Sequence, residues 1–385
     1  LFSACFRILW SDCFCKMKKN LLVAAFCFVT APVYAGEFFY DVSGISNAFY
    51  GYSDYSEKFR PQYKHSHTPA SAELYTAAGY NFDDKTAFKL GLDLQAAGGK
   101  EVEDYNQGKW GENIYGTLES AYGEFSIGQV YNAAYQLAVG APKVGYFKAN
   151  NSPITDFIAN PNWQRHSRVA SYRTLNSTYL NTDADAPKIS YITPEFYRTK
   201  LAVSYTPDSY SEAGLINKHS RYDSRSSYAA GLYNHQDFGK FEVESSLGYA
   251  YNRKNNQEVS AGLSIYRKGW TLDGSYRKSF TSSGDYALND AVGLPYYFDG
   301  YRRSSAYNVG LSYEFGPLTT GVSYFASSAD KTDNKDKIVT WANKIAVHKY
   351  VSLYLAAAYA EYTGGRDVSE NNRGYAFISG VELEF

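Results

Sequence analysis

The residues with the clearest potential for chemistry are two histidines, His65 and His67, on either side of Ser66. An imidazole beside a hydroxyl can activate a nucleophile, and two imidazoles can hold a metal ion. The polar stretch around them supplies no cysteine and no clear carboxylate cluster, so the pattern favours a solvated loop. We therefore expect no catalytic site, no metal and no cofactor, and a protein that is not an enzyme.

Other chemical signatures are also missing from the sequence. It contains no glycine-rich phosphate cradle, no zinc box and no basic helix for nucleic acid. Lys+Arg number 38 against 39 Asp+Glu, a net charge of −1, which argues against a nucleic-acid partner. All four cysteines fall within the first 27 residues, so disulfides and thiolate metal sites are not expected beyond them.

The first 35 residues have the pattern of a targeting segment. Met17 is followed by two lysines, an apolar run over residues 21–29 and a small-x-small site that ends at Ala35. This order is typical of a secretory signal peptide, so we expect residues 17–35 to be removed. Residues 1–16 are interpreted as an upstream extension from a misplaced start. The mature domain is then expected to be residues 36–385, with a net charge of −4.

The elements of this domain are indicated by alternation with a period of two. Between Thr86 and Ala97, apolar side chains occupy every second position, and lysine, aspartate and glutamine occupy positions between them. Such alternation predicts a strand with one apolar and one polar face. Sixteen segments follow this pattern. Their expected ranges are 36–52, 71–82, 86–97, 110–122, 125–131, 187–193, 199–206, 226–236, 239–252, 257–266, 270–280, 303–315, 318–327, 337–347, 350–362 and 373–385.

The connections between these segments alternate between tight turns and longer polar loops, which is the wiring of an outer-membrane barrel. Aromatic residues, 17% of the chain, gather near strand ends. At a membrane interface such rings lie partly in lipid and partly in contact with water. A soluble β-sandwich also fits the alternation, but its packed core would not contain so many Gly, Ser and charged residues. We predict an all-β protein, a sixteen-stranded antiparallel transmembrane β-barrel in the Gram-negative outer membrane.

One connection, residues 132–186, is far longer than an ordinary loop and is therefore expected to have a function. The stretch 115–129 before it reads Tyr-Gly-x-Leu-x-x-x-Tyr-Gly-x-Phe-x-Ile-Gly-Gln, and the hairpin 188–208 after it contains Lys-Ile-Ser-Tyr and Val-Ser-Tyr-Thr-Pro-Asp. In these motifs the chain resembles the general diffusion porins of Gram-negative bacteria, most closely the alphaproteobacterial branch. The resemblance implies a homotrimer whose third loop folds into the lumen, where loop acids face basic wall residues across a constriction.

Several residues of this sequence match those roles, and the resemblance assigns them to two groups. The pore constriction is expected to contain Asp156, Asp183 and Asp185 as acids and Lys89, Arg165, Arg168 and Arg173 as bases. The pore lining, placed inward by the alternation, is expected to contain Asp93, Glu119, Asp273, Arg277 and Glu314. Charges around a narrow aqueous gap sort ions by sign.

The last strand ends on Phe385, and a terminal aromatic residue resembles the signal that the barrel assembly machinery reads in such barrels. The lipid bilayer and lipopolysaccharide are the other expected partners. The leading hypothesis is a water-filled porin for passive diffusion of ions and small hydrophilic solutes. The alternative is an adhesion barrel that binds a partner through extracellular loops at 53–70, 207–225 and 281–302.

Overall fold

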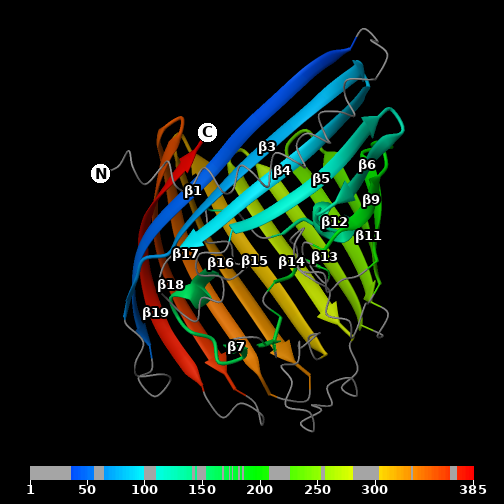
Figure 1. Ribbon diagram of the computed structural model, residues 1–385. Helices are drawn as coiled ribbons and strands as arrows, with labels where there is room; N and C mark the ends of the chain where they lie inside the picture. Colours follow the sequence, from blue (N-terminus) through cyan, green and yellow to red (C-terminus); the bar gives the residue numbers. More distant parts are fainter. Residues whose placement is uncertain are drawn as a thin grey trace, which may run out of the picture.

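The computed structural model is an all-β molecule built around one large sheet (Figure 1). It describes residues 36–55, 65–98, 110–140, 144, 153–166, 169–172, 174–175, 177–180, 183, 186–207, 226–252, 256–280, 303–330, 333–364 and 371–385. The expected upstream extension and signal peptide, residues 1–35, lie outside this part of the chain.

Sixteen strands of five residues or more form the wall in the part of the chain that the structure describes. They are β1 (Glu37–Tyr55), β3 (Ala70–Asp83), β4 (Thr86–Gly98), β5 (Trp110–Ser120), β6 (Gly123–Gly128), β9 (Lys188–Ile192), β10 (Thr199–Thr206), β11 (Ser227–Asp237), β12 (Glu242–Asn252), β13 (Asn256–Arg267), β14 (Trp270–Ser279), β15 (Ser304–Phe315), β16 (Leu318–Ala329), β17 (Lys335–His348), β18 (Val351–Thr363) and β19 (Asn372–Glu384). The two-residue β2 (Ser66–His67) pairs with β1.

The sheet closes on itself, because β1 and β19 pair antiparallel from Ile45 opposite Glu384 to Tyr55 opposite Gly374. Every other wall strand pairs antiparallel with its neighbours in chain order. Closure removes the open edges that a bilayer cannot tolerate. The predicted antiparallel sixteen-stranded barrel is confirmed, and each predicted strand corresponds to an observed one with ends displaced by at most three residues.

The two faces of the wall differ as the alternation predicted. On β10, the side chains of Leu201, Val203 and Tyr205 are exposed on the outside, whereas Ala202 and Ser204 are buried on the inside. Water cannot satisfy polar groups within the hydrocarbon layer, so the apolar face must be the outer one. The inside then carries the small and polar residues.

Aromatic side chains pack against one another near both ends of the strands on the outer face. The ring centroids of Trp270 and Tyr313 lie 4.5 Å apart next to a short turn. Near the opposite strand ends, the centroids of Tyr205 and Tyr228 lie 5.0 Å apart, and those of Tyr359 and Tyr375 lie 4.9 Å apart. These positions are those of the two aromatic girdles that flank the apolar band of a membrane barrel.

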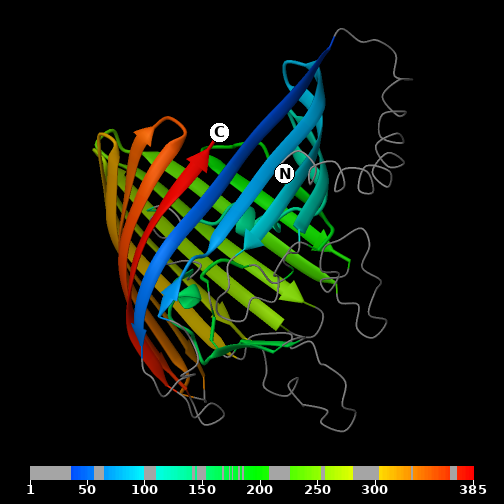
Figure 2. The same ribbon diagram turned by 60° about the vertical axis from the view of Figure 1, so that its left-hand side comes forward.

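The connections at one end of the barrel are tight. Lys268 and Gly269, with φ of 49° and 83°, form a two-residue hairpin between Arg267 and Trp270. Positive φ at both central residues matches the right-handed twist of the flanking strands, and glycine reaches it without strain. Figure 2 shows the end of β19 and the β17–β18 hairpin at this same end of the barrel. The wall is therefore wired with short turns at one end.

Short elements of the third loop lie within the barrel rather than in its wall (Figures 1 and 2). They are α2 (Ala133–Gln136), the 3-10 helix η1 (Pro153–Asp156) and a hairpin of β7 (Trp163–His166) and β8 (Val169–Tyr172). Among the described residues, no helix is long and apolar enough to cross a bilayer. The buried core of the molecule lies where this loop meets the inner face of the wall.

Candidate functional site

The candidate site is the lumen of the barrel together with the third loop, residues 129–187, which joins β6 to β9. The chain leaves the wall after Gly128, the last residue of β6, whose φ is 121°. Gln129 holds the departure point by two hydrogen bonds with the backbone of Ile114, at 2.9 and 3.0 Å. The Asn132 side chain then accepts a hydrogen bond from the Tyr135 amide, the usual N-cap interaction, and starts α2.

The outgoing limb, residues 130–140, lies directly on the inner faces of β10 to β13. The amide of Ala133 donates to the Ser204 hydroxyl at 3.0 Å, and the amide of Val139 donates to Ser246 at 2.8 Å. Glycines on the wall allow this close approach, because a Cβ on Gly262 would overlap the Val139 carbonyl oxygen. Small residues on the inner face of the wall, such as Gly262, Ser204 and Ser246, thus let the backbone of the limb contact the wall directly. We call these wall residues the loop bed.

The far end of the loop packs against the opposite side of the lumen. Ile154, Phe157 and Ile158 are fully buried in one cluster with inward residues of β1 and β16 to β19. A side chain at Gly51 on β1 would occupy the space of the Phe157 ring. This apolar contact fixes the turning point of the loop.

The return limb, residues 174–186, follows the wall back. The Leu175 amide donates to the Ser327 hydroxyl on β16 at 2.8 Å, and the hydroxyls of Thr178 and Ser275 lie 2.6 Å apart. In the far part of the loop, on either side of the β7–β8 hairpin, Asn162 and Thr174 both donate to the buried carboxylate of Asp336 on β17. Hydrogen bonds to successive strands therefore hold the described part of the return limb against the wall.

A buried ion pair supports the middle of the return limb. The guanidinium of Arg277 on β14 pairs with the carboxylate of Glu258 on β13, and the Arg277 Nε donates to Glu258 Oε2 at 2.7 Å. The Arg277 Nη1 also donates to the Tyr179 carbonyl oxygen at 2.6 Å. Both side chains are buried, so this arginine links the wall to the loop.

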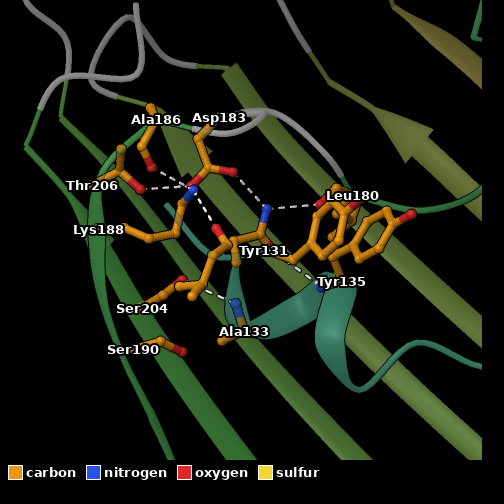
Figure 3. Close-up of polar contacts among 12 residues, drawn as sticks. Tyr131, Ala133, Tyr135, Leu180, Asp183, Ala186, Lys188, Ser190, Ser204 and Thr206 are labelled. Atoms are coloured by element: carbon orange, nitrogen blue, oxygen red, sulfur yellow. Dashed lines mark hydrogen bonds and ion pairs between the residues drawn. The ribbon is translucent and has the colours of Figure 1, made fainter. Parts of the chain in front are cut away.

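A second polar cluster closes the loop at β9 and β10 (Figure 3). Asp183 accepts hydrogen bonds from the Asn132 amide group at 2.7 Å and from the Thr206 hydroxyl at 2.6 Å. Its carboxylate also lies 3.9 Å from the Lys188 ammonium group, which donates to the Ala186 carbonyl oxygen at 2.6 Å. The outgoing and return limbs are joined here.

Two of the expected site residues, Asp183 and Arg277, are therefore buried at loop anchors, each with a relative exposure of 1%. Lys89 lies on the inner face of β4, where its ammonium group is 2.8 Å from the Glu119 carboxylate. Asp93 lies on the same strand, four residues further along.

The other expected constriction residues are described only in part. Asp156 ends η1 and Arg165 lies in β7, where the structure describes their backbones. Arg168, Arg173 and Asp185 lie outside the described residues. His65, from the histidine pair, has its Nδ1 2.9 Å from the Ser53 carbonyl oxygen. Within the described residues, no group of three His, Cys, Asp or Glu could hold a metal ion.

Beneath the outgoing limb is an open chamber of about 510 Å³, the lumen space between the loop and β10 to β16. Two expected pore-lining residues, Asp273 and Glu314, face it. Sequence reasoning missed Glu244 and Lys200, which line it too, although their alternation on β12 and β10 places them inward. It also missed that the wall glycines and serines contact the loop. The sequence signal for this role is that unusually many residues on the inward-facing positions are small.

We expect the substitution Gly262→Val to displace the outgoing limb from the wall. The new Cβ would overlap the backbone carbonyl group of Val139, which cannot move aside as a flexible side chain can. Overpacking of this kind costs about 1–3 kcal/mol, and the displaced limb should make single-channel currents noisier. The matched control is Gly274→Val on the outer face of β14, where a Cβ has its nearest neighbour at 3.5 Å. Equal unfolding free energies and equal current noise for the two variants would show that a small residue at position 262 is not needed to hold the limb against the wall.

A closed sixteen-stranded barrel with an apolar exterior and a loop lodged in its lumen defines a class of protein, the outer-membrane channels. The comparisons agree. The model of the Gram-negative porin family matches residues 22–365. The chain therefore belongs to the Gram-negative porin family. It is an outer-membrane channel for passive diffusion.

Similar proteins come from sequence and from structure. An uncharacterised protein of Rickettsia bellii is 26% identical over 341 residues, 71% of this chain and 76% of that protein. The anion-selective porin from Comamonas acidovorans superposes with a TM-score of 0.57 at 14% identity, covering 91% of this chain and all of that one. A triple mutant of the Rhodopseudomonas blastica porin superposes at 0.53 with 12% identity, covering 90% and 100%. These low identities establish the shared fold.

Proposed function

We propose that ions and small hydrophilic solutes cross this channel through the space between the third loop and the wall, with no chemical step. The observation that carries the proposal is the loop itself, anchored from β10 to β1 within a closed barrel. A polar lining around open space, here the chamber of about 510 Å³, is what a hydrated solute requires.

The constriction is proposed to lie where the loop narrows the lumen. Asp156, Arg165, Arg168, Arg173 and Asp185 are its candidate loop charges. On the wall, the candidates are Lys89, Asp93, Glu119, Asp273 and Glu314, whose inward positions support a role in the lining. For Asp183 and Arg277 we propose a supporting role, because both are buried in contacts that hold the loop.

Reconstitution into a planar bilayer tests the function. We expect stepwise conductance increases in KCl, since each insertion opens one water-filled path or a small fixed number of them. Protein that carries the spectrum of a folded β-barrel and inserts without conductance would refute the channel. The adhesion alternative would then become the better hypothesis; nothing in the described residues favours it, and most of the extracellular loops it needs lie outside them.

We further propose that the protein assembles as a homotrimer after export. The signal peptide 17–35 would be cleaved, the barrel assembly machinery would read the strand that ends at Phe385, and lipopolysaccharide would contact the outer face. Phe385 exchanges backbone hydrogen bonds with Gly44 at 2.9 and 3.0 Å, so it is part of the closing seam. A gel run without heating should show a trimer that dissociates on heating, whereas a monomer alone would count against assembly.

A further inference from the structure

Three basic side chains gather at the short-turn end of the barrel, the end at which β19 finishes (Figure 2). Lys240 lies in the turn between β11 and β12, whereas Arg267 is the last residue of β13 and Lys268 begins the turn that follows it. The two hairpins are neighbours, because β12 pairs with β13. The three side chains line a depression of about 370 Å³ between the two turns.

These three side chains are free to meet a ligand. All three are exposed, and within the described residues none of them makes a hydrogen bond or an ion pair. Basic residues on the inner wall differ in this respect, since Lys89 is 2.8 Å from the Glu119 carboxylate. Every turn at this end of the barrel belongs to the part of the chain that the structure describes, so the charges that border the depression are known.

Two carboxylates, those of Asp237 and Glu242, line the same depression from its lumen side. They are opposite each other across β11 and β12. Glu244, two residues further along β12, lines the chamber in the lumen, so by alternation this row faces inward. Asp237 also accepts a hydrogen bond from the Gly239 amide at 2.6 Å, which holds the turn.

Arg267 belongs instead to the lipid-facing row of β13. Leu263, four residues before it in that row, is exposed on the outside of the barrel. Arg267 is paired with Trp270, and Trp270 with Tyr313, so the arginine is level with two rings of the aromatic girdle. A guanidinium at this depth lies at the membrane interface, where the lipid headgroups are.

The other hairpin also presents aromatic rings beside its basic residue. Phe238 and Phe241 close the turn that contains Lys240, with the Phe238 amide donating to the Phe241 carbonyl oxygen at 3.0 Å. Their ring centroids lie 5.1 Å apart, and both rings are exposed. Apolar rings next to a cation offer one surface for a lipid chain and another for a charged headgroup.

From this arrangement we propose that the depression binds the headgroup of an anionic phospholipid in the periplasmic leaflet, with its phosphate held by Lys240, Arg267 and Lys268. The leaflet follows from the wiring, because the short turns of such a barrel lie on the periplasmic side. A guanidinium can donate two parallel hydrogen bonds to a phosphate, and the ammonium groups add point charges. The proposal goes beyond the channel function, since it concerns the boundary with lipid and not the path of the solute.

Mass spectrometry of the intact folded barrel, released from detergent micelles, tests the proposal. The probes are dioleoyl phosphatidylglycerol and dioleoyl phosphatidylcholine, which share their chains and their phosphate and differ in net headgroup charge. We expect the barrel to retain phosphatidylglycerol about 10-fold more strongly, because several basic residues act on one anionic headgroup. The triple variant Lys240→Gln, Arg267→Gln and Lys268→Asn should reduce this preference to about 1- to 2-fold. Asparagine suits position 268, where φ is 49°.

The matched control neutralises three cations that lie on separate turns at the same end. Lys85, Arg198 and Lys349 belong to the β3–β4, β9–β10 and β17–β18 turns. Their joint replacement, by Lys85→Gln, Arg198→Asn and Lys349→Gln, changes the net charge equally and should leave the preference for phosphatidylglycerol intact. The folded band on an unheated gel checks that both variants form the barrel.

The outcomes separate this proposal from the channel function. A wild-type barrel that retains both lipids equally, a site variant that keeps the preference, or a control that loses it to the same extent would overturn the proposal. Release of the lipid by millimolar inorganic phosphate would overturn it too, because a free anion makes no contact with the rings. Stepwise conductance in a bilayer reports the channel function independently of these measurements.

Discussion

Replacing Glu258 by glutamine should destabilise the folded barrel by about 3–5 kcal/mol, because the Arg277 guanidinium then remains buried without its counter-charge. The loss is expected to be large since neither side chain can move into water: Arg277 is 1% exposed and lies beneath the return limb, with its Nη1 bonded to the Tyr179 carbonyl oxygen. Urea unfolding in detergent micelles measures the change. The temperature at which the folded gel band disappears provides an independent readout.

The matched control for this variant is Glu119→Gln. Glu119 also pairs with a basic residue at short distance, but the side chains of Lys89 and Glu119 are 33% and 47% exposed. Exposed pairs contribute at most about 1 kcal/mol, so this variant should unfold almost as the wild type does. If the two variants lost the same stability, the buried pair would not be an anchor of the loop.

A second large effect is expected when the far part of the loop is removed. Gly140 and Ser177 both lie near the middle of the loop bed, since Val139 contacts β13 and Thr178 contacts β14. Residues 141–176 can therefore be replaced by a short Gly-Ser linker without disturbing α2 or the Asp183 cluster. Conductance should rise on the order of twofold, because the obstructing segment is gone while the wall is intact.

The control for the deletion keeps the loop at full length and weakens its far anchor. Phe157→Ala empties the space against Gly51 and the inward residues of β17 to β19. It should reduce stability by about 3–5 kcal/mol and increase current noise while mean conductance stays near that of the wild type. A deletion variant with a correct β spectrum and unchanged conductance would show that the loop does not limit flow.

The wall of this protein could be predicted from its sequence almost completely. A strand between lipid and water must alternate, because each side chain meets one of two opposite solvents, and this constraint is local. It was sufficient to assign β10 to residues 199–206, the range that the structure gives. Closure followed from physics as well, since an open edge has no partner in a bilayer.

The candidate site could be predicted only in part, because alternation tells which face a residue is on and not what covers that face. Arg277 and Glu314 are both inward by sequence, on neighbouring strands. In the structure, Arg277 lies beneath the return limb, whereas Glu314 faces the open chamber. The same limit applies to Asp183, which the family resemblance assigned to the constriction and whose carboxylate joins the two limbs of the loop.

Sequence alone thus determined the barrel, its two faces and the presence of one long inserted connection. The tertiary structure decided where that connection lies. The wall residues that it contacts, such as Ser204 and Gly51, are far apart along the chain and are brought together by the closure of sixteen strands. These residues are small because a segment from elsewhere in the sequence packs against them. No local pattern encodes such a requirement, so only the folded barrel separates the charges that face the solute from those that hold the loop.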